Sequence, residues 1–309
     1  MGEIFYMVKR NSLIFLRERS AVFFSLLSML IVLALMVIFL GRMNSQSLVH
    51  MLSEYGGERD AAADERNAAY LIQLWTLAGI LVVNAVTVTL TVTGAMVQDE
   101  TEKRLMAFYV TPVSRLKLSL GYILAAWLVG TGMCLLTLAA GEIYFAVQGY
   151  GILGAGTLLK LTGMTGLNTF VFSAIAYLLA LFVHNSSAWS GLLTIIGTLV
   201  GFAGGIYLPM DALSEQVQSV LKCLPVLHGA AMMRKVRTEE AVAETFLGLP
   251  EMAGDVFREA MGITVSAGKH AISEGYHTIS VGEQVLLLLF YAIMAIGAAW
   301  VLSRRRKLK

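Results

Sequence analysis

The sequence predicts an all-α integral membrane protein with six transmembrane helices, an amino-terminal interfacial helix, a short cytoplasmic helix and a small extracellular helical loop before the last span. Three observations predict this class. Hydrophobic residues make up 57% of the chain, charged residues only 14%, and the mean hydropathy is +0.72, whereas a soluble domain is typically about 45–50% apolar and about 25% charged. The apolar residues fall in long runs, and the basic residues of the short loops gather on one side.

Six apolar runs are long enough to cross a bilayer, whose hydrocarbon core of about 30 Å requires about 20 helical residues. Helix is expected because lipid offers no partner to an unpaired backbone group. The alternating threonines of 86–94 resemble a strand, but a threonine hydroxyl can bond back to its own helix. The first run exceeds a signal-peptide core and is expected to remain as an anchor. The expected spans are approximately 20–41, 70–97, 118–147, 158–183, 187–208 and 282–302.

The distribution of lysine and arginine predicts the orientation, because cytoplasmic loops carry an excess of both. One side of the predicted bundle is rich in them: Lys9, Arg10, Arg17, Arg19, Lys103, Arg104, Arg115, Lys117, Arg304, Arg305, Arg306, Lys307 and Lys309. The short loops of the other side hold only Arg42, Arg59, Arg66 and Lys160. Both ends of the chain are therefore expected in the cytoplasm, at the plasma membrane of a bacterial cell.

Three segments of the single transmembrane domain, 1–309, are expected outside the spans. Residues 1–19 place apolar side chains around a polar break, which favours a helix on the inner membrane surface; the alternative is a simple extension of the first span. Residues 98–117 form a charged cytoplasmic helical segment. Residues 209–280 are the only sizeable loop and are expected outside the cell.

Helix signals within the loop 209–280 divide it further. Apolar residues at helical spacing from Leu213 to Leu224 predict an amphipathic helix that stops before Pro225. Thr238, followed by two glutamates, predicts a helix start, and Gly262 predicts a helix stop. Ser280 and Glu283 have the spacing of a capping box at the start of the last span.

Several motifs of catalysis are missing from the sequence. It contains no GxxxxGK[ST] phosphate loop, no HExxH and no GxSxG. The five histidines are scattered, so that no metal cluster is suggested. The predicted spans carry no Asp, Lys or Arg near their centres, where an ion-coupled carrier usually keeps them. We therefore expect no enzyme activity, no catalytic residue, no metal and no cofactor bound by this chain itself.

The segment 98–125 carries the most specific pattern. Its acidic residues precede a basic pair, an apolar stretch follows, and a Thr-Pro-Val-Ser-Arg break at 111–115 closes it. A short helix is expected to end before Pro112, because the residue before a proline disfavours helix. Such a helix, with Met106, Phe108 and Tyr109 available for contact, is suited to a groove on a partner; the alternative is an ordinary charged loop.

This segment resembles the coupling region of permease subunits in the type-2 ABC transporter family. The order of elements is also similar, and 204–234 resembles that family's outer re-entrant region. The resemblance implies a separate ABC ATPase subunit, which would bind ATP and Mg²⁺ and push on the amino-terminal helix and the segment 99–115. The residues that would contact or couple to it are Asp99, Glu100, Glu102, Lys103, Arg104, Met106, Phe108, Thr111, Pro112 and Arg115.

Two further groups of residues are candidates for function. Gly197, Gly201 and Gly205 form a GxxxGxxxG stripe, which lets two helices approach closely. The stripe serves either packing within one chain or contact with a second permease copy or paralogue. Asn84, Glu142 and Asn168 are polar residues at depth, which would line a translocation path or bond to neighbouring helices.

The resemblance thus implies the transmembrane subunit of an ATP-driven exporter. The small outer region and the apolar spans favour a hydrophobic or amphipathic cargo, such as a drug, an antimicrobial peptide or a lipid-like molecule, with a role in drug efflux and antibiotic resistance. The alternatives are a polysaccharide-exporting permease of the same family and an ion-coupled carrier or channel. No interaction with nucleic acid is expected.

Overall fold

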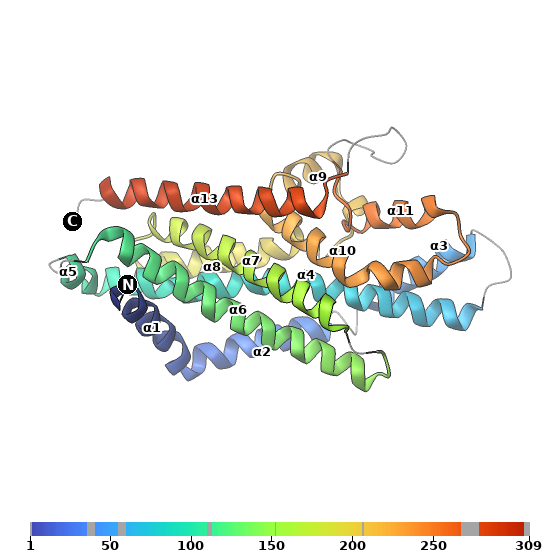
Figure 1. Ribbon diagram of the computed structural model, residues 1–309, viewed down its shortest axis with the longest axis horizontal. Helices are drawn as coiled ribbons and strands as arrows, with labels where there is room; N and C mark the ends of the chain where they lie inside the picture. The colour runs from blue at the N-terminus through green and yellow to red at the C-terminus, as the bar shows by residue number, and fades with distance from the viewer. Residues whose placement is uncertain are drawn as a thin grey trace.

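The computed structural model describes residues 2–35, 41–54, 60–109, 113–151, 153–205, 207–266 and 278–305, and these are almost entirely helical. The long helices run roughly along the long axis of the molecule (Figure 1). Their bounds are α1 Gly2–Arg17, α2 Arg19–Leu35, α3 Gly41–Glu54, α4 Ala61–Thr101, α5 Arg104–Tyr109, α6 Arg115–Val147, α7 Ala155–Ala180, α8 Ser186–Ala203, the 3-10 turn η2 Met210–Ala212, α9 Glu215–Leu221, α10 Pro225–Thr245, α11 Glu251–Ala260 and α13 Val281–Arg305.

Five helices are long and apolar enough to cross a membrane: α4, α6, α7, α8 and α13. Each contains most of one span predicted from the sequence. The sixth predicted span, 20–41, overlaps the 17-residue α2 and the first residue of α3, and residues 36–40 lie outside the described part of the chain. The structure thus bears out the all-helical class, and at five of the six predicted spans it has a helix long and apolar enough to cross a membrane.

Helix α4 is the centre of the bundle. It packs against α6, α7, α8 and α10, and α3 also packs against it. The threonines of its strand-like stretch bond back to the helix as expected: Thr89 and Thr93 donate to the carbonyl oxygens of Ala85 and Thr89 at 2.6 and 2.7 Å. These bonds satisfy the hydroxyl groups within the helix, which confirms the prediction of a helix here.

The two ends of the bundle differ in composition. At one end lie α1, α5, the start of α6 and the end of α13 (left in Figure 1), and at the other lie α3, α11 and the end of α10. Helices α1 and α5 are short and contain charged residues. Helix α1 precedes the apolar α2, and α5 lies between the long apolar helices α4 and α6. The first end therefore collects the segments for which the sequence predicts a cytoplasmic place.

The region from 209 to 280 contains more helix than the sequence predicts. Helix α9 is shorter than the expected 213–224, and α10 begins at Pro225, as the proline signal requires. The predicted helix start at Thr238 is wrong, because its hydroxyl donates to the carbonyl oxygen of Arg234 inside α10. Gly262, with φ +61°, follows the end of α11 as predicted. The structure says nothing of residues 267–277.

The predicted capping box at the start of α13 is confirmed. The backbone N–H of Ser280 donates to Glu283 at 2.7 Å, and the backbone N–H of Glu283 donates to the Ser280 hydroxyl at 3.3 Å. Asp60, Ser114 and Asn185 cap α4, α6 and α8 in the same way, through side chains that accept from the first turn. These bonds satisfy N–H groups that a helix leaves open at its start.

Candidate functional site

Asp99 joins three helices at the α5 end of the bundle. Its side chain is 1% exposed, although it stands in the last turn of α4. The guanidinium of Arg10 in α1 donates to both carboxylate oxygens at 2.7 Å, and the hydroxyl of Tyr122 in α6 donates to one of them at 2.6 Å. Bidentate, charge-assisted bonds of this kind are among the strongest in proteins. We call Arg10, Asp99 and Tyr122 the Asp99 cluster.

Arg10 also connects the Asp99 cluster to α5. Its guanidinium carbon lies 5.2 Å from the centre of the Phe108 ring, within cation–π range. The hydrogen bonds to Asp99 raise the pKa of Arg10 above its ordinary value, so its guanidinium stays charged throughout the physiological range. One arginine thereby fixes α1 to α4 and to α5.

The amino-terminal helix α1 is held close to α6. Met7, Asn11 and Phe15, at positions i, i+4 and i+8, form its buried face. Gly121 of α6 permits this contact, because a Cβ atom there would lie 2.6 Å from the Cβ of Met7. At the edge of the same contact, Lys117 donates to Glu3 at 2.7 Å.

The chain turns sharply between α4 and α5. Lys103 has φ +57°, in the left-handed region that few residues other than glycine adopt. Arg104 then pairs with Glu102 and lies 3.7 Å from Asp99. The predicted segment 98–117 is thus three pieces: the last turn of α4, the six-residue α5 and the start of α6 at Arg115.

The residues predicted to couple to a partner divide into two groups. Glu102, Lys103, Arg104 and Met106 are exposed, and we call these four the α5 surface. Glu100, Phe108 and Arg115 are partly buried, and Asp99 is buried and turned inward. Thr111 and Pro112 lie outside the described residues.

Two contacts tie this end to the other helices. His184, in the turn between α7 and α8, lies 3.0 Å from Glu100 of α4. Arg115 of α6 donates to the carbonyl oxygen of Ser303 near the end of α13 at 2.6 Å. A displacement of α4 or α6 at this end would therefore reach α7, α8 and α13.

The glycine stripe of α8 does not present one continuous open face. A Cβ atom at Gly197 would meet nothing within 4 Å, but one at Gly201 would collide with the ring of Tyr207 in the same chain. Gly205 lies beyond the end of α8 with φ +62°, and its carbonyl oxygen accepts from Arg234 at 3.1 Å. Two of the three glycines thus serve contacts within this chain, and Gly197 is open.

The three polar residues predicted at depth each face a neighbouring helix. Asn84 of α4 donates to the Thr137 hydroxyl of α6 at 3.3 Å. Glu142 of α6 accepts from Arg237 of α10 at 2.8 Å, with side-chain exposures of 14% and 5%. Asn168 of α7 lies against Gly229 of α10. The structure does not gather these residues around one shared path.

Helix α10 packs within the bundle against α4 and α7. The guanidinium carbon of Arg234 lies 4.1 Å from the centre of the Trp75 ring in α4, and Trp75 in turn donates to the carbonyl oxygen of Met261 at 2.7 Å. Arg237 lies over Phe145 of α6 at 5.4 Å. The sequence alone places this helix in an outer loop, whereas it forms part of the core.

An apolar cavity of about 600 Å³ lies between α4, α7, α8, α10 and α13. Its lining is aliphatic apart from a phenylalanine, a proline and Tyr291, whose hydroxyl donates to the carbonyl oxygen of Cys223. The connection from α9 to α10, at 224–226, closes one side of it. A cavity of this size and lining suits an apolar group of the size of a small drug.

Comparison with known protein families assigns the chain. A family described as "ABC-2 family transporter protein" matches residues 53–302, which include α4 to α11 and most of α13. The chain belongs to the ABC-2 transporter family. A search of curated proteins found no match. As an ABC-2 protein, the chain is the transmembrane component of an ABC transporter, and the ATPase that drives it is a separate partner.

Membership of the ABC-2 family implies that a separate ABC ATPase acts on this transmembrane component. The sequence predicted the segment 98–115 for this contact but missed Arg10 and Tyr122. The signal for Arg10 was the polar Asn11 between Met7 and Phe15 on an otherwise apolar face of α1. For Tyr122 the sequence offers none, because it stands among apolar residues of a span.

Proposed function

We propose that this ABC-2 component is the membrane subunit of an exporter and that its ATPase partner docks on the α5 surface. The Asp99 cluster carries this proposal. It fixes α1, α4 and α6 together next to the α5 surface, which exposes three charged residues and a methionine: Glu102, Lys103, Arg104 and Met106. A push on α5 would be passed to three helices at once, which is what a coupling element requires.

The same proposal includes an orientation and a cargo. Both ends of the chain lie in the cytoplasm, and α1 rests on the inner membrane surface, where its exposed Phe5, Tyr6 and Leu16 contact lipid. ATP and Mg²⁺ are bound by the partner. The apolar cavity supports a hydrophobic or amphipathic cargo, such as a drug, an antimicrobial peptide or a lipid-like molecule, and hence a role in drug efflux.

Removing the charges of the α5 surface tests the docking. We expect that the ATPase no longer co-purifies with the variant Glu102→Gln/Arg104→Gln/Met106→Ser, or that the cargo-stimulated ATP turnover of the complex falls at least tenfold. Its membrane insertion and melting temperature should stay close to those of the wild type, because all three side chains are exposed. Glu100 is left unchanged because it contacts His184.

A matched control lies at the far end of α4. Glu65 and Arg66 are exposed in the first turns of α4, at the opposite end of the bundle. The variant Glu65→Gln/Arg66→Gln should keep wild-type ATPase binding and turnover. Normal turnover in the α5 variant, or equal losses in both, would contradict docking at the α5 surface.

We also propose that two copies of this chain, or this chain and a paralogue, meet along α8. This helix exposes Ile195, Leu199 and Phe202 and is buried over little of its length. Gly191 is open and lies on the same face as these three, whereas Gly197, the open glycine of the stripe, lies on a different face. Gly191→Leu should weaken self-association about tenfold, since overpacking a close contact costs about 1–3 kcal/mol.

The stoichiometry of purified protein in nanodiscs, counted by single-molecule photobleaching, measures this effect. Gly197→Leu is the control, because Gly197 is also open but stands on another face of α8. Gly201→Leu is unsuitable, since the new side chain would collide with Tyr207 of its own chain. A Gly191 variant that remains paired as the wild type does would remove α8 from the interface.

A further inference from the structure

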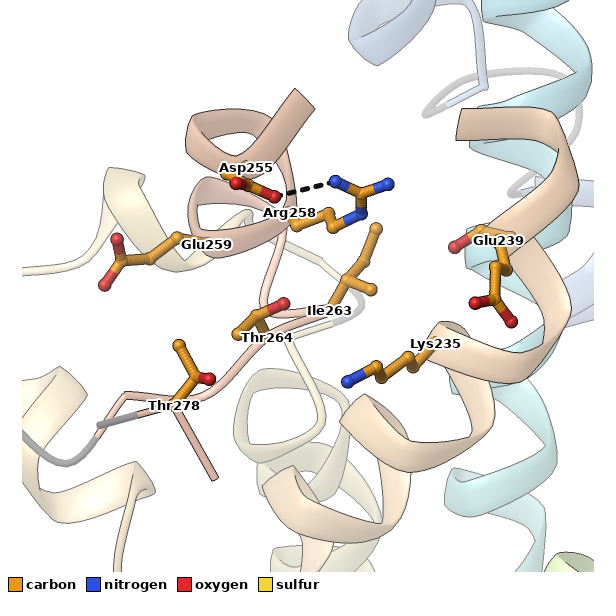
Figure 2. Close-up of a pocket in the computed structure, with 9 residues that line it drawn as sticks. Lys235, Glu239, Asp255, Arg258, Glu259, Ile263, Thr264 and Thr278 are labelled. Atoms are coloured by element: carbon orange, nitrogen blue, oxygen red, sulfur yellow. Dashed lines mark hydrogen bonds and ion pairs between the residues drawn. The ribbon is translucent and has the colours of Figure 1, made fainter. Parts of the chain in front are cut away.

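A polar pocket of about 330 Å³ lies at the end of the bundle opposite α5 (Figure 2). Helix α10 forms one wall with Lys235, Thr238 and Glu239, and α11 forms the other with Asp255, Arg258 and Glu259. Ile263 and Thr264 form the floor, and Thr278 stands at the edge. Its volume is at the lower limit for ligand sites, so it suits a metabolite-sized group rather than a bulky drug.

The charged groups of the α11 wall already have partners close to them in the chain. Arg258 donates to Asp255 at 2.8 Å, and Glu259 accepts from the Ser266 hydroxyl at 2.9 Å. Within the described residues, no ion pair is formed by Lys235 or Glu239. These two lie one turn apart on α10, so the helix presents an ammonium group and a carboxylate side by side to the pocket.

The pocket's basic groups approach from opposite walls. Figure 2 shows the Lys235 side chain extending from α10 toward Thr264, and the guanidinium of Arg258 extending from α11 toward the α10 wall, with Ile263 between them and Thr264 to one side. Only one terminal nitrogen of Arg258 is engaged by Asp255. An anionic group between the walls could therefore accept from Lys235, Arg258 and the Thr264 hydroxyl, which is a favourable donor set for a carboxylate or phosphate.

Glu239 supplies the opposite charge one turn further along α10. A simple anion would leave this carboxylate without a counter-charge and would be repelled by it. A ligand that carries an ammonium group beside its anionic group would satisfy both. We propose that this pocket binds a zwitterionic group, with its anion held between Lys235 and Arg258 and its ammonium at Glu239.

Phosphoethanolamine is the probe that tests this site, because it carries a phosphate and a primary ammonium two carbons apart. Its binding to the full-length protein in phosphatidylglycerol nanodiscs would be measured by isothermal titration calorimetry without ATP. We expect saturable binding at least tenfold tighter than that of inorganic phosphate or ethanolamine alone. Lys235→Ala and Glu239→Gln should each weaken binding about tenfold, the loss expected for one charge-assisted contact.

Two controls match these variants. Glu240→Gln removes an exposed carboxylate next to Glu239 but outside the pocket, and Lys160→Ala removes an exposed lysine at the start of α7. Both should bind the probe as the wild type does. Thermal melting would confirm that all four variants are folded. Absence of saturable binding, equally tight binding of phosphate alone, or equal losses in the controls would overturn the proposal.

The source of the zwitterion is separated by a second titration. Nanodiscs that contain phosphatidylethanolamine would compete with the soluble probe if the pocket receives a lipid headgroup, and its apparent affinity would fall. An unchanged affinity would assign the pocket to a soluble zwitterion. Because the measurement needs no ATPase and no transport, its failure would leave docking at the α5 surface untouched.

Discussion

Asp99→Asn is expected to loosen the α5 end of the bundle and to uncouple it from its ATPase. The amide keeps the shape of the carboxylate but removes the charge that Arg10 binds with two bonds of 2.7 Å. Losing charge-assisted bonds of a group that is 1% exposed should cost about 2 kcal/mol of stability. Thermal melting in detergent would show the loss of stability, and cargo-stimulated ATP turnover would show the loss of coupling.

A double-mutant cycle separates the Arg10–Asp99 bond from general damage. Arg10→Gln/Asp99→Asn should be no less stable than either single variant, because the bond is already absent in each. Lys9→Gln is the control, since Lys9 is the exposed neighbour of Arg10 on the same helix. An Asp99 variant that melts and turns over like the wild type would show that α1 is held in another way.

Arg237→Met is expected to have the largest effect on stability at the opposite end. It would leave the Glu142 carboxylate, 14% exposed, without the cation that lies 2.8 Å away. Removing one partner of a buried ion pair typically costs about 3–5 kcal/mol, because the remaining charge stays in a medium of low dielectric. Denaturation followed by tryptophan fluorescence would measure this loss in detergent.

The neutral pair provides the decisive comparison. Glu142→Gln/Arg237→Met should recover most of the lost stability, since no buried charge is left unpaired. Arg258→Met breaks a more exposed pair of similar length and should cost less than about 1 kcal/mol. If the two arginine variants were equally stable, the α6–α10 contact would not depend on its charges.

The sequence predicts the apolar helices well, because lipid imposes a length and a composition on each of them. The predicted 118–147 corresponds to Arg115–Val147, and 282–302 to Val281–Arg305. Helix α4 extends past the predicted 70–97 at both ends, since its first turns are polar and a hydropathy window does not include them. Asp60, which caps that helix, was the overlooked signal.

Contacts between distant segments account for most of what sequence reasoning missed. Arg10 and Asp99 were both assigned to the cytoplasmic side, but nothing in a linear pattern pairs residues 89 positions apart. The burial of α10 was missed for a related reason. Its arginines suggest a solvated helix, whereas Arg234 stacks on Trp75 and Arg237 pairs with Glu142. The glycine stripe misled in part, because Tyr207 covers Gly201 from within the chain.

The length of α4 has a mechanical consequence. Its 41 residues extend over about 60 Å, roughly twice the hydrocarbon thickness of a bilayer. The Asp99 cluster holds one end of this rod, and Trp75, with the stacked Arg234, stands in the other half, about 9 Å from the midpoint. A tilt of about 5° around its midpoint would move the two ends roughly 3 Å in opposite directions. A single rigid helix is thus long enough for a small tilt to couple a displacement of α5 on one side of the midpoint to an opposite displacement of α10 on the other side.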